Sequence, residues 1–214
     1  MEVSTLKDIK TILSLGMTAP EVVIRIVEAT PEIRLLLLKV YSSAKNLEEE
    51  PVIQIRTSVD RMIYHNPPEL EETIWLERNE ITLERIKEIA DRLAEKRALA
   101  ITSSVKLFNT EEIFHIPMMD FKCEASPENL EKIQEFLRKI GQKGVVLLSG
   151  RSYHYYGIEL LSERDWLLYL GKCLLFIDFV DSRYVGHRLI DGYTSLRISR
   201  EIRRPNLPKV VAIV

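Results

Sequence analysis

The stretch VVLLSGRSYHYYGIELL, residues 145–161, decides the fold, because two apolar runs flank a short polar turn. Val145–Leu148 and Tyr153–Leu161 are rich in β-branched and aromatic residues, which favour strands. Ser149-Gly150-Arg151-Ser152 between them has the small and polar residues of a tight connection. The stretch therefore predicts two neighbouring strands joined by a polar turn.

Helices and strands on either side of these two strands extend the pattern. A strand at His115–Cys123 and a helix that begins at Ser126-Pro127 precede it, and a helix capped by Ser162 and a strand at Ser195–Arg200 follow it. A last strand is expected at Lys209–Val214. The β-α-β-β-α-β order is that of the RRM-like, ferredoxin-like layout, in which the fourth, first, third and second strands lie side by side.

The first half of the chain predicts two further units. Residues 1–48 are interpreted as an N-terminal helical segment, in which Thr30-Pro31 begins a helix over Ile33–Tyr41. Residues 51–112 are interpreted as an αβ unit, and residues 113–214 as the RRM-like unit. The expected elements of the αβ unit are Val52–Ile55, Thr73–Leu76, Thr82–Lys96 and Ala98–Leu107. The predicted class is α+β.

Composition excludes several classes of protein. The 214 residues are 46% hydrophobic, enough for a buried core, but no apolar run reaches the roughly 18 residues of a membrane span. The two cysteines, Cys123 and Cys173, are too few for a disulfide framework. We expect a cytoplasmic protein that contacts no membrane. The net charge of −2 does not suggest a protein coated for nucleic acid, although totals hide local patches.

The turn and the strand after it carry the residues of a phosphate site. Gly150 lets backbone N–H groups approach a ligand, Arg151 can bind a phosphate with two hydrogen bonds, and His154 can donate a third. Ser149 adds a small polar residue. A plain polar hairpin, with His154 stacked on a neighbouring tyrosine, is the alternative.

Two aspartates could hold a metal ion. Asp120 ends an apolar strand, and Asp191 lies just before another. Carboxylates that converge repel each other unless a divalent cation such as Mg²⁺ or Mn²⁺ neutralises them. Alternatively, Asp120 caps the next helix or pairs with an arginine, and Asp191 only forms a turn with Gly192.

Residues 183–209 hold a local excess of five positive charges, seven basic side chains against two acidic ones. Such a basic segment could follow a polynucleotide backbone or hold a triphosphate. A charged edge strand that resists pairing with another chain is the alternative.

Together these stretches resemble the archaeo-eukaryotic primase superfamily, particularly the bacterial primase 1D-like proteins. Ser149-Gly150-Arg151-Ser152-Tyr153-His154 is similar to the family's small-Gly-Arg-Gly-x-His motif, whose histidine contacts the incoming nucleotide, although Ser152 replaces the second glycine. Asp120 matches the first acid of its Asp-x-Asp motif, and Lys122 stands where the second acid is usual. Asp191 and Arg197 resemble its third motif.

The resemblance implies a nucleotidyltransferase that uses Mg²⁺ or Mn²⁺ to prime or extend DNA or RNA, in replication or repair. Asp120 and Asp191, with Glu124, would hold the metal, and Asp120, Asp191 and His154 would be catalytic. Ser149, Gly150, Arg151, His154 and Arg197 would bind the nucleoside triphosphate. A module that binds nucleotide or nucleic acid without turnover is the second hypothesis, and an unrelated ferredoxin-like interaction protein is the third. The leading helices could bind protein partners.

Overall fold

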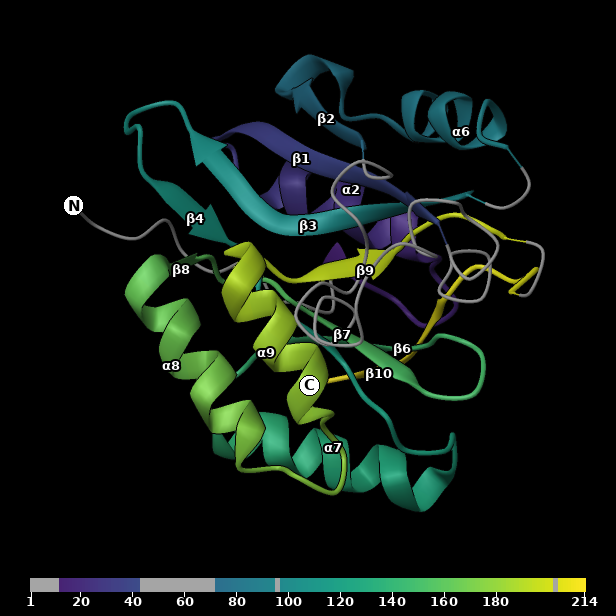
Figure 1. Ribbon diagram of the computed structural model, residues 1–214, viewed down its shortest axis with the longest axis vertical. Helices are drawn as coiled ribbons and strands as arrows, with labels where there is room; N and C mark the ends of the chain where they lie inside the picture. Colours follow the sequence, from purple (N-terminus) through teal and green to yellow (C-terminus); the bar gives the residue numbers. More distant parts are fainter. Residues whose placement is uncertain (1–11, 43–71, 95–96, 202–203) are drawn as a thin grey trace, which may run out of the picture.

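The computed structural model describes residues 12–42, 72–94, 97–201 and 204–214 (Figure 1). The predicted strand Val52–Ile55 and residues 1–11 and 43–48 of the predicted helical segment lie outside these residues. None of the described helices is long and apolar enough to cross a membrane. The described part combines helices with two antiparallel sheets, which confirms the α+β class.

The larger sheet is built mainly from the first half of the chain. Its strands are β1 (Ile33–Ser42), β2 (Glu72–Glu77), β3 (Arg97–Leu107), β4 (Ile113–His115), β8 (Leu161–Ser162) and β9 (Ser195–Arg197). Their order is β2-β1-β3-β4-β8, and β9 pairs with β3 beside the stretch that pairs with β4. Three strands from the second half of the chain, β4, β8 and β9, thus complete a sheet begun by the first half.

The predicted helix over Ile33–Tyr41 is wrong, because these residues form the strand β1 between β2 and β3. The run IRLLLLKVY has four consecutive leucines and no clear period, and a short apolar run of this kind occurs both in helices and in buried strands. Thr30 ends the preceding helix α2 (Ala19–Ala29) rather than beginning a new one. The segment 33–42 therefore belongs to the same sheet as β2 and β3, whereas the predicted boundary near residue 50 lies outside the described residues.

The smaller sheet carries the hairpin that the sequence predicted. Its order is β10 (Lys209–Ile213), β6 (Gly144–Leu148), β7 (Tyr153–Gly157) and β5 (Met118–Asp120). The first, third and second strands of the predicted layout are neighbours, as expected. The fourth is not: β9 pairs with β3 of the larger sheet, although it packs close to β5. The RRM-like strand order is therefore only partly present.

The single strand predicted over His115–Cys123 is divided between the two sheets. Proline at position 117 has no N–H to donate, and its carbonyl accepts from the Gly157 backbone N–H at 2.7 Å, while the Ile116 N–H donates to Ser103 at 2.8 Å. A Cβ on Gly157 would lie 2.8 Å from the proline ring, so this crossing requires glycine there. The chain leaves one sheet at His115 and enters the other at Met118.

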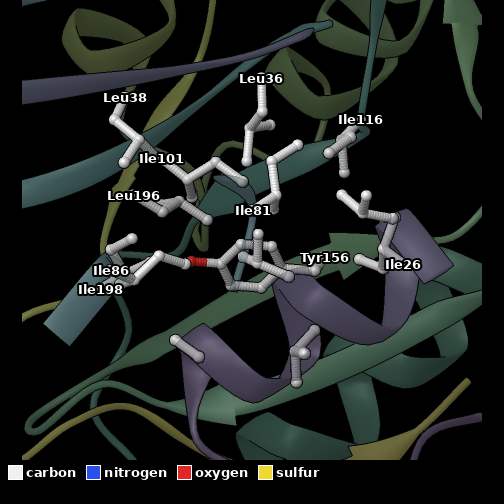
Figure 2. Close-up of a cluster of buried hydrophobic side chains, with 14 of the residues drawn as sticks. Ile26, Leu36, Leu38, Ile81, Ile86, Ile101, Ile116, Tyr156, Leu196 and Ile198 are labelled. Atoms are coloured by element: carbon white, nitrogen blue, oxygen red, sulfur yellow. The ribbon is translucent and has the colours of Figure 1, made fainter. Parts of the chain in front are cut away.

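Helices cover both faces of the smaller sheet (Figure 1). Helices α7 (Pro127–Lys139), α8 (Glu163–Leu174) and α9 (Ser182–Asp191) pack on one face. On the other face lie α2 and the larger sheet, and α6 (Leu83–Asp91), which follows the short 3-10 helix η2 (Arg78–Glu80), joins the same core. Figure 2 shows the ring of Tyr156 among aliphatic side chains of that core. The two clusters of buried side chains hold the smaller sheet in place between them.

The predicted helix starts are present. The Ser126 hydroxyl accepts from the Asn129 N–H at 3.1 Å, and Ser162 caps α8 by accepting from the Asp165 N–H at 3.2 Å. Helix α9, by contrast, is not among the elements that the sequence predicted. Its sequence SRYVGHRLID buries little apolar surface and contains a glycine, which weakened the helical pattern.

Candidate functional site

Asp120 and His154 come together because β5 and β7 pair with these two residues directly opposite each other. Nε2 of His154 lies 3.5 Å from Oδ1 of Asp120. The histidine side chain is only 4% exposed, whereas 43% of the aspartate side chain remains exposed. The imidazole therefore supports the carboxylate from within the sheet, and the carboxylate faces outward, where a ligand can reach it.

The surroundings shift both pKa values away from their usual range. Burial lowers the pKa of His154 to about 3, and the positive charges of Arg197 and Arg204 lower it further, so the imidazole is neutral at pH 7. Burial raises the pKa of Asp120 to about 6, although the positive charges of Arg204, Arg188 and Arg197 act in the opposite direction. Nδ1 of His154 is buried and has no hydrogen-bond partner among the described residues. The pair thus offers a neutral imidazole beside a carboxyl group that is easily protonated.

Arg197 lies next to this pair but is committed to backbone contacts. Its side chain is 2% exposed, and burial lowers its pKa. Nη2 donates to the Ser149 carbonyl at 3.2 Å, and Nη1 donates to the carbonyls of Ser199 and of Asn206, the latter at 3.2 Å. The guanidinium therefore joins the 149–152 turn to the segment before β10, and it positions the site more than it presents a free charge.

The 149–152 turn is held at its base and open at its tip. Ser149 donates through both its N–H and its hydroxyl to the Ser152 carbonyl, at 2.9 and 3.1 Å, and the Ser152 hydroxyl donates to Phe121 O, next to Asp120. Gly150 has φ +134° with open space around it. The exposed Arg151 side chain has no hydrogen bond or ion pair within the described part of the chain. The turn thus presents one unengaged cation beside the strand that carries Asp120.

The other predicted metal ligands are not assembled with Asp120. Asp191 ends α9 and pairs with Arg188, Nη2 to Oδ2 at 2.8 Å. Glu124 is exposed, because β5 ends at Asp120 and the chain bends at Cys123. Over residues 12–42, 72–94, 97–201 and 204–214, no three His, Cys, Asp or Glu residues form a group that could hold a metal ion. The metal-binding roles of Asp120, Asp191 and Glu124 stay predictions.

The residue that the sequence reading missed is Asp181. An antiparallel bridge joins Phe121 to Val180, and the Lys122 N–H donates to the Phe179 carbonyl at 2.8 Å. In this register Asp181 lies across from Asp120, and its charge contributes to the raised pKa of that carboxyl. Its own Oδ1 accepts from the Arg183 N–H, which caps α9. The sequence signal for Asp181 is its position at a helix start, because Asp-Ser-Arg before an apolar pattern is typical of the first residues of a helix.

Tyrosine hydroxyls and arginines surround the carboxylates. Tyr184 donates to the Ser195 carbonyl at 3.3 Å, and burial raises the pKa of Tyr41 to about 12 and that of Tyr156 further. Arg188 is 5% exposed and donates to the Ser195 hydroxyl at 2.5 Å. Of the basic segment 183–209, Arg188 and Arg197 are therefore structural, and Arg203 lies outside the described residues. The exposed cations of that segment are Arg183, Arg200, Arg204 and Lys209.

Comparison with known proteins identifies a family that this chain matches. A family model described as archaeo-eukaryotic primase 1D-like matches residues 77–209. The match runs from the last residue of β2 to the first residue of β10 and includes every residue of the site described above except Tyr41. No curated protein and no solved structure matches the chain.

Proposed function

The chain belongs to the archaeo-eukaryotic primase 1D-like family, and on that premise we propose that it binds a nucleoside triphosphate at Asp120 and His154 and extends or primes a nucleic acid strand. The observation that carries this proposal is the meeting of three distant segments. Asp120 and His154 come from paired strands, and Arg197 reaches the turn before His154 from β9. These are the residue types that the family resemblance assigned to one site.

The residues present fit one divalent cation. Asp120 and Asp181 supply two oxygen-bearing side chains, and Mg²⁺ is commonly held by one or two carboxylates together with phosphates of the substrate. Lys122, which stands in the place of the second acid, is exposed. Its positive charge favours a single ion over a pair of ions. Such an ion would neutralise charge that develops on the phosphates during transfer.

The chain's own groups would bind and orient the triphosphate. Arg151 at the tip of the turn is free to bind a phosphate oxygen, and the open space around Gly150 lets a phosphate approach the backbone. Nδ1 of His154, which is buried and has no partner in the described residues, would form a hydrogen bond with the nucleotide. Arg197 would keep the turn and β9 in register.

One observation favours the second candidate function, a module that binds nucleotide or nucleic acid without turnover. Lys122 places a positive charge two residues from Asp120, where a second ligand for metal would otherwise stand. The turn and its arginine do not depend on a metal, so binding would outlast the loss of catalysis. We give this function second place because Asp181 supplies a carboxylate that the sequence pattern alone did not reveal.

An extension assay tests the two functions together. The protein is incubated with labelled nucleotides, a primed template and Mn²⁺, beside the Asp120→Asn variant and a Glu135→Gln control on the exposed face of α7. Product from the wild type and the control, but not from Asp120→Asn, supports the transferase. No product, with salt-sensitive nucleotide binding that Arg151→Ala weakens, supports the binding module. Neither product nor binding contradicts both.

A further inference from the structure

Glu201 and Arg204 pair through their backbones next to the site described above. The Glu201 N–H donates to the Arg204 carbonyl at 3.2 Å, and the Arg204 N–H donates to the Glu201 carbonyl at 3.0 Å. Nη1 of Arg197 lies 3.5 Å from the Arg204 carbonyl, and Nη2 of the same guanidinium donates to the Ser149 carbonyl. Arg197 therefore joins the backbone of Arg204 to the 149–152 turn.

The two side chains of this pair differ in exposure. The Glu201 side chain is 4% exposed, whereas the Arg204 side chain is 57% exposed, and Nε of Arg204 lies 3.4 Å from Oε1 of Glu201. Nη1 and Nη2 of Arg204 have no hydrogen bond or ion pair with any described residue. In an ordinary surface ion pair both partners are solvated. Here a buried carboxylate holds the inner end of an exposed guanidinium and leaves its outer end available to a ligand.

The charge of Arg204 acts on the residues of the site. Burial is the main cause of the shifted pKa values of Asp120 and His154, and the positive charge of Arg204 acts to lower both pKa values. Among the charges that act on the pKa of Asp120, that of Arg204 has the largest effect. Because the interaction between charges declines with distance, the guanidinium of Arg204 lies near this carboxyl group.

The site thus includes two arginines that have unengaged nitrogen atoms. Arg151 lies at the tip of the 149–152 turn, and Arg204 lies on the segment that Arg197 joins to that turn. A guanidinium with two free nitrogen atoms can donate to two oxygens of one phosphate. Two such arginines match more than one phosphate group, which a triphosphate supplies and a monophosphate does not.

We propose that Arg204 binds a phosphate of the nucleoside triphosphate and that Glu201 positions it, so that the site selects triphosphates over monophosphates. The inference rests on the proposed function, because it takes the nucleotide to lie at Asp120 and His154. Arg204 would contact the substrate, whereas Glu201 would act through Arg204 by restricting the conformations of its side chain. The alternative, that Arg204 binds the backbone of a nucleic acid strand, is an outcome of the test.

Calorimetric titration with ATP and Mn²⁺ tests the role of Arg204, and competition by AMP tests the selection. Arg204→Met should weaken ATP binding by about tenfold or more and change AMP binding by less than about twofold. Arg204→Lys, which keeps the charge but not the paired donors, should recover part of the loss. Arg138→Met is the matched control, because Arg138 is an exposed arginine in the last turn of α7. The control should bind ATP as the wild type does.

A double-mutant cycle tests the positioning role of Glu201. Glu201→Gln should weaken ATP binding by about threefold or more, because Arg204 loses the contact that restricts it. If Glu201 acted only through its negative charge, its removal would strengthen the binding of a triphosphate, so tighter binding would overturn the positioning role. In the Arg204→Met background, Glu201→Gln should have no further effect on ATP affinity. Urea unfolding checks that each variant is folded.

The outcomes separate this inference from the proposed function. Wild-type ATP affinity in Arg204→Met would overturn the inference, whereas loss of ATP binding in Asp120→Asn would leave the proposed function standing. An equal loss of ATP and AMP binding would overturn the selection. Weaker binding of labelled single-stranded DNA with unchanged ATP affinity would assign Arg204 to the nucleic acid and overturn the inference. A wild type that binds no ATP would contradict both the inference and the proposed function.

Discussion

Asp120 and Asp181 lie across from each other because Phe121 and Val180, their respective neighbours in the chain, form an antiparallel bridge. The relationship brings the end of β5 to the start of α9, two segments that the sequence separates by a helix, a hairpin and another helix. Burial is the main cause of the raised pKa of Asp120, and the negative charge of Asp181 across from it raises the pKa further.

This relationship predicts different roles for two aspartates. Asp181→Asn should weaken binding of Mn²⁺ in the presence of nucleotide by about tenfold or more, because it removes a carboxylate beside Asp120. Asp191→Asn should affect metal binding little and should instead loosen the end of α9, where Asp191 pairs with Arg188. Titration calorimetry measures both affinities. Equal losses in the two variants would contradict the assignment of Asp181.

Asp120→Asn should stabilise the unliganded protein near neutral pH. In the unfolded chain this carboxyl titrates near pH 3.8, and in the folded chain at about 6, so ionisation costs free energy only in the folded state. The penalty is absent below about pH 3.8, grows as the pH rises from 3.8 to 6, and is complete above pH 6. The melting temperature of the variant should therefore exceed that of the wild type at about pH 7.5 and approach it near pH 4. A lower melting temperature for Asp120→Asn at neutral pH would contradict this.

His154 should produce a pH dependence of the opposite sign. Its pKa falls from 6.5 in the unfolded chain to about 3 in the folded chain. Above pH 6.5 the imidazole is neutral in both states. As the pH falls from 6.5 toward 3 the unfolded chain binds a proton that the folded chain does not, so the free energy of unfolding declines. From pH 7.5 to 5 this loss should be on the order of 1–2 kcal/mol in the free energy of unfolding. Urea unfolding of the wild type and His154→Gln measures it. The pH dependence should be weaker in the variant, and an unchanged slope would show that His154 is not the cause.

Arg197→Met should destabilise the protein by about 3 kcal/mol, because it leaves backbone carbonyls of Ser149 and Asn206 without their donor inside the protein. Arg200→Met is the matched control, since this neighbouring arginine is exposed. It should change the free energy of unfolding by less than about 0.5 kcal/mol. Denaturant unfolding compares the two variants. Similar small effects from both would mean that Arg197 carries a free charge and does not position the turn.

The sequence predicted much of the second half of the chain, for local reasons. Helix starts at Ser126 and Ser162 are set by a hydroxyl and a nearby N–H, and the hairpin turn is set by Gly150. The meeting of Asp120 with His154 could also be predicted, because it follows from the pairing of strands that the pattern identified.

What could not be predicted depends on packing between distant segments. The run of leucines within Ile33–Tyr41 has no period that separates a helix from a strand, and its pairing with β2 and β3 makes it a strand. Likewise the sequence of β9 does not indicate which sheet it joins, and its pairing with β3 places it in the larger one. Asp181 entered the site through the bridge at Val180, which no periodicity in the sequence indicates.

The most direct test of the central claim is the affinity of the protein for a nucleoside triphosphate with Mn²⁺, measured for the wild type, Asp120→Asn, Arg151→Ala and the control Glu135→Gln. If Asp120 and the 149–152 turn form one nucleotide site, both site variants weaken binding by roughly tenfold or more and the control leaves it unchanged. Wild-type affinity in both Asp120→Asn and Arg151→Ala would contradict the account.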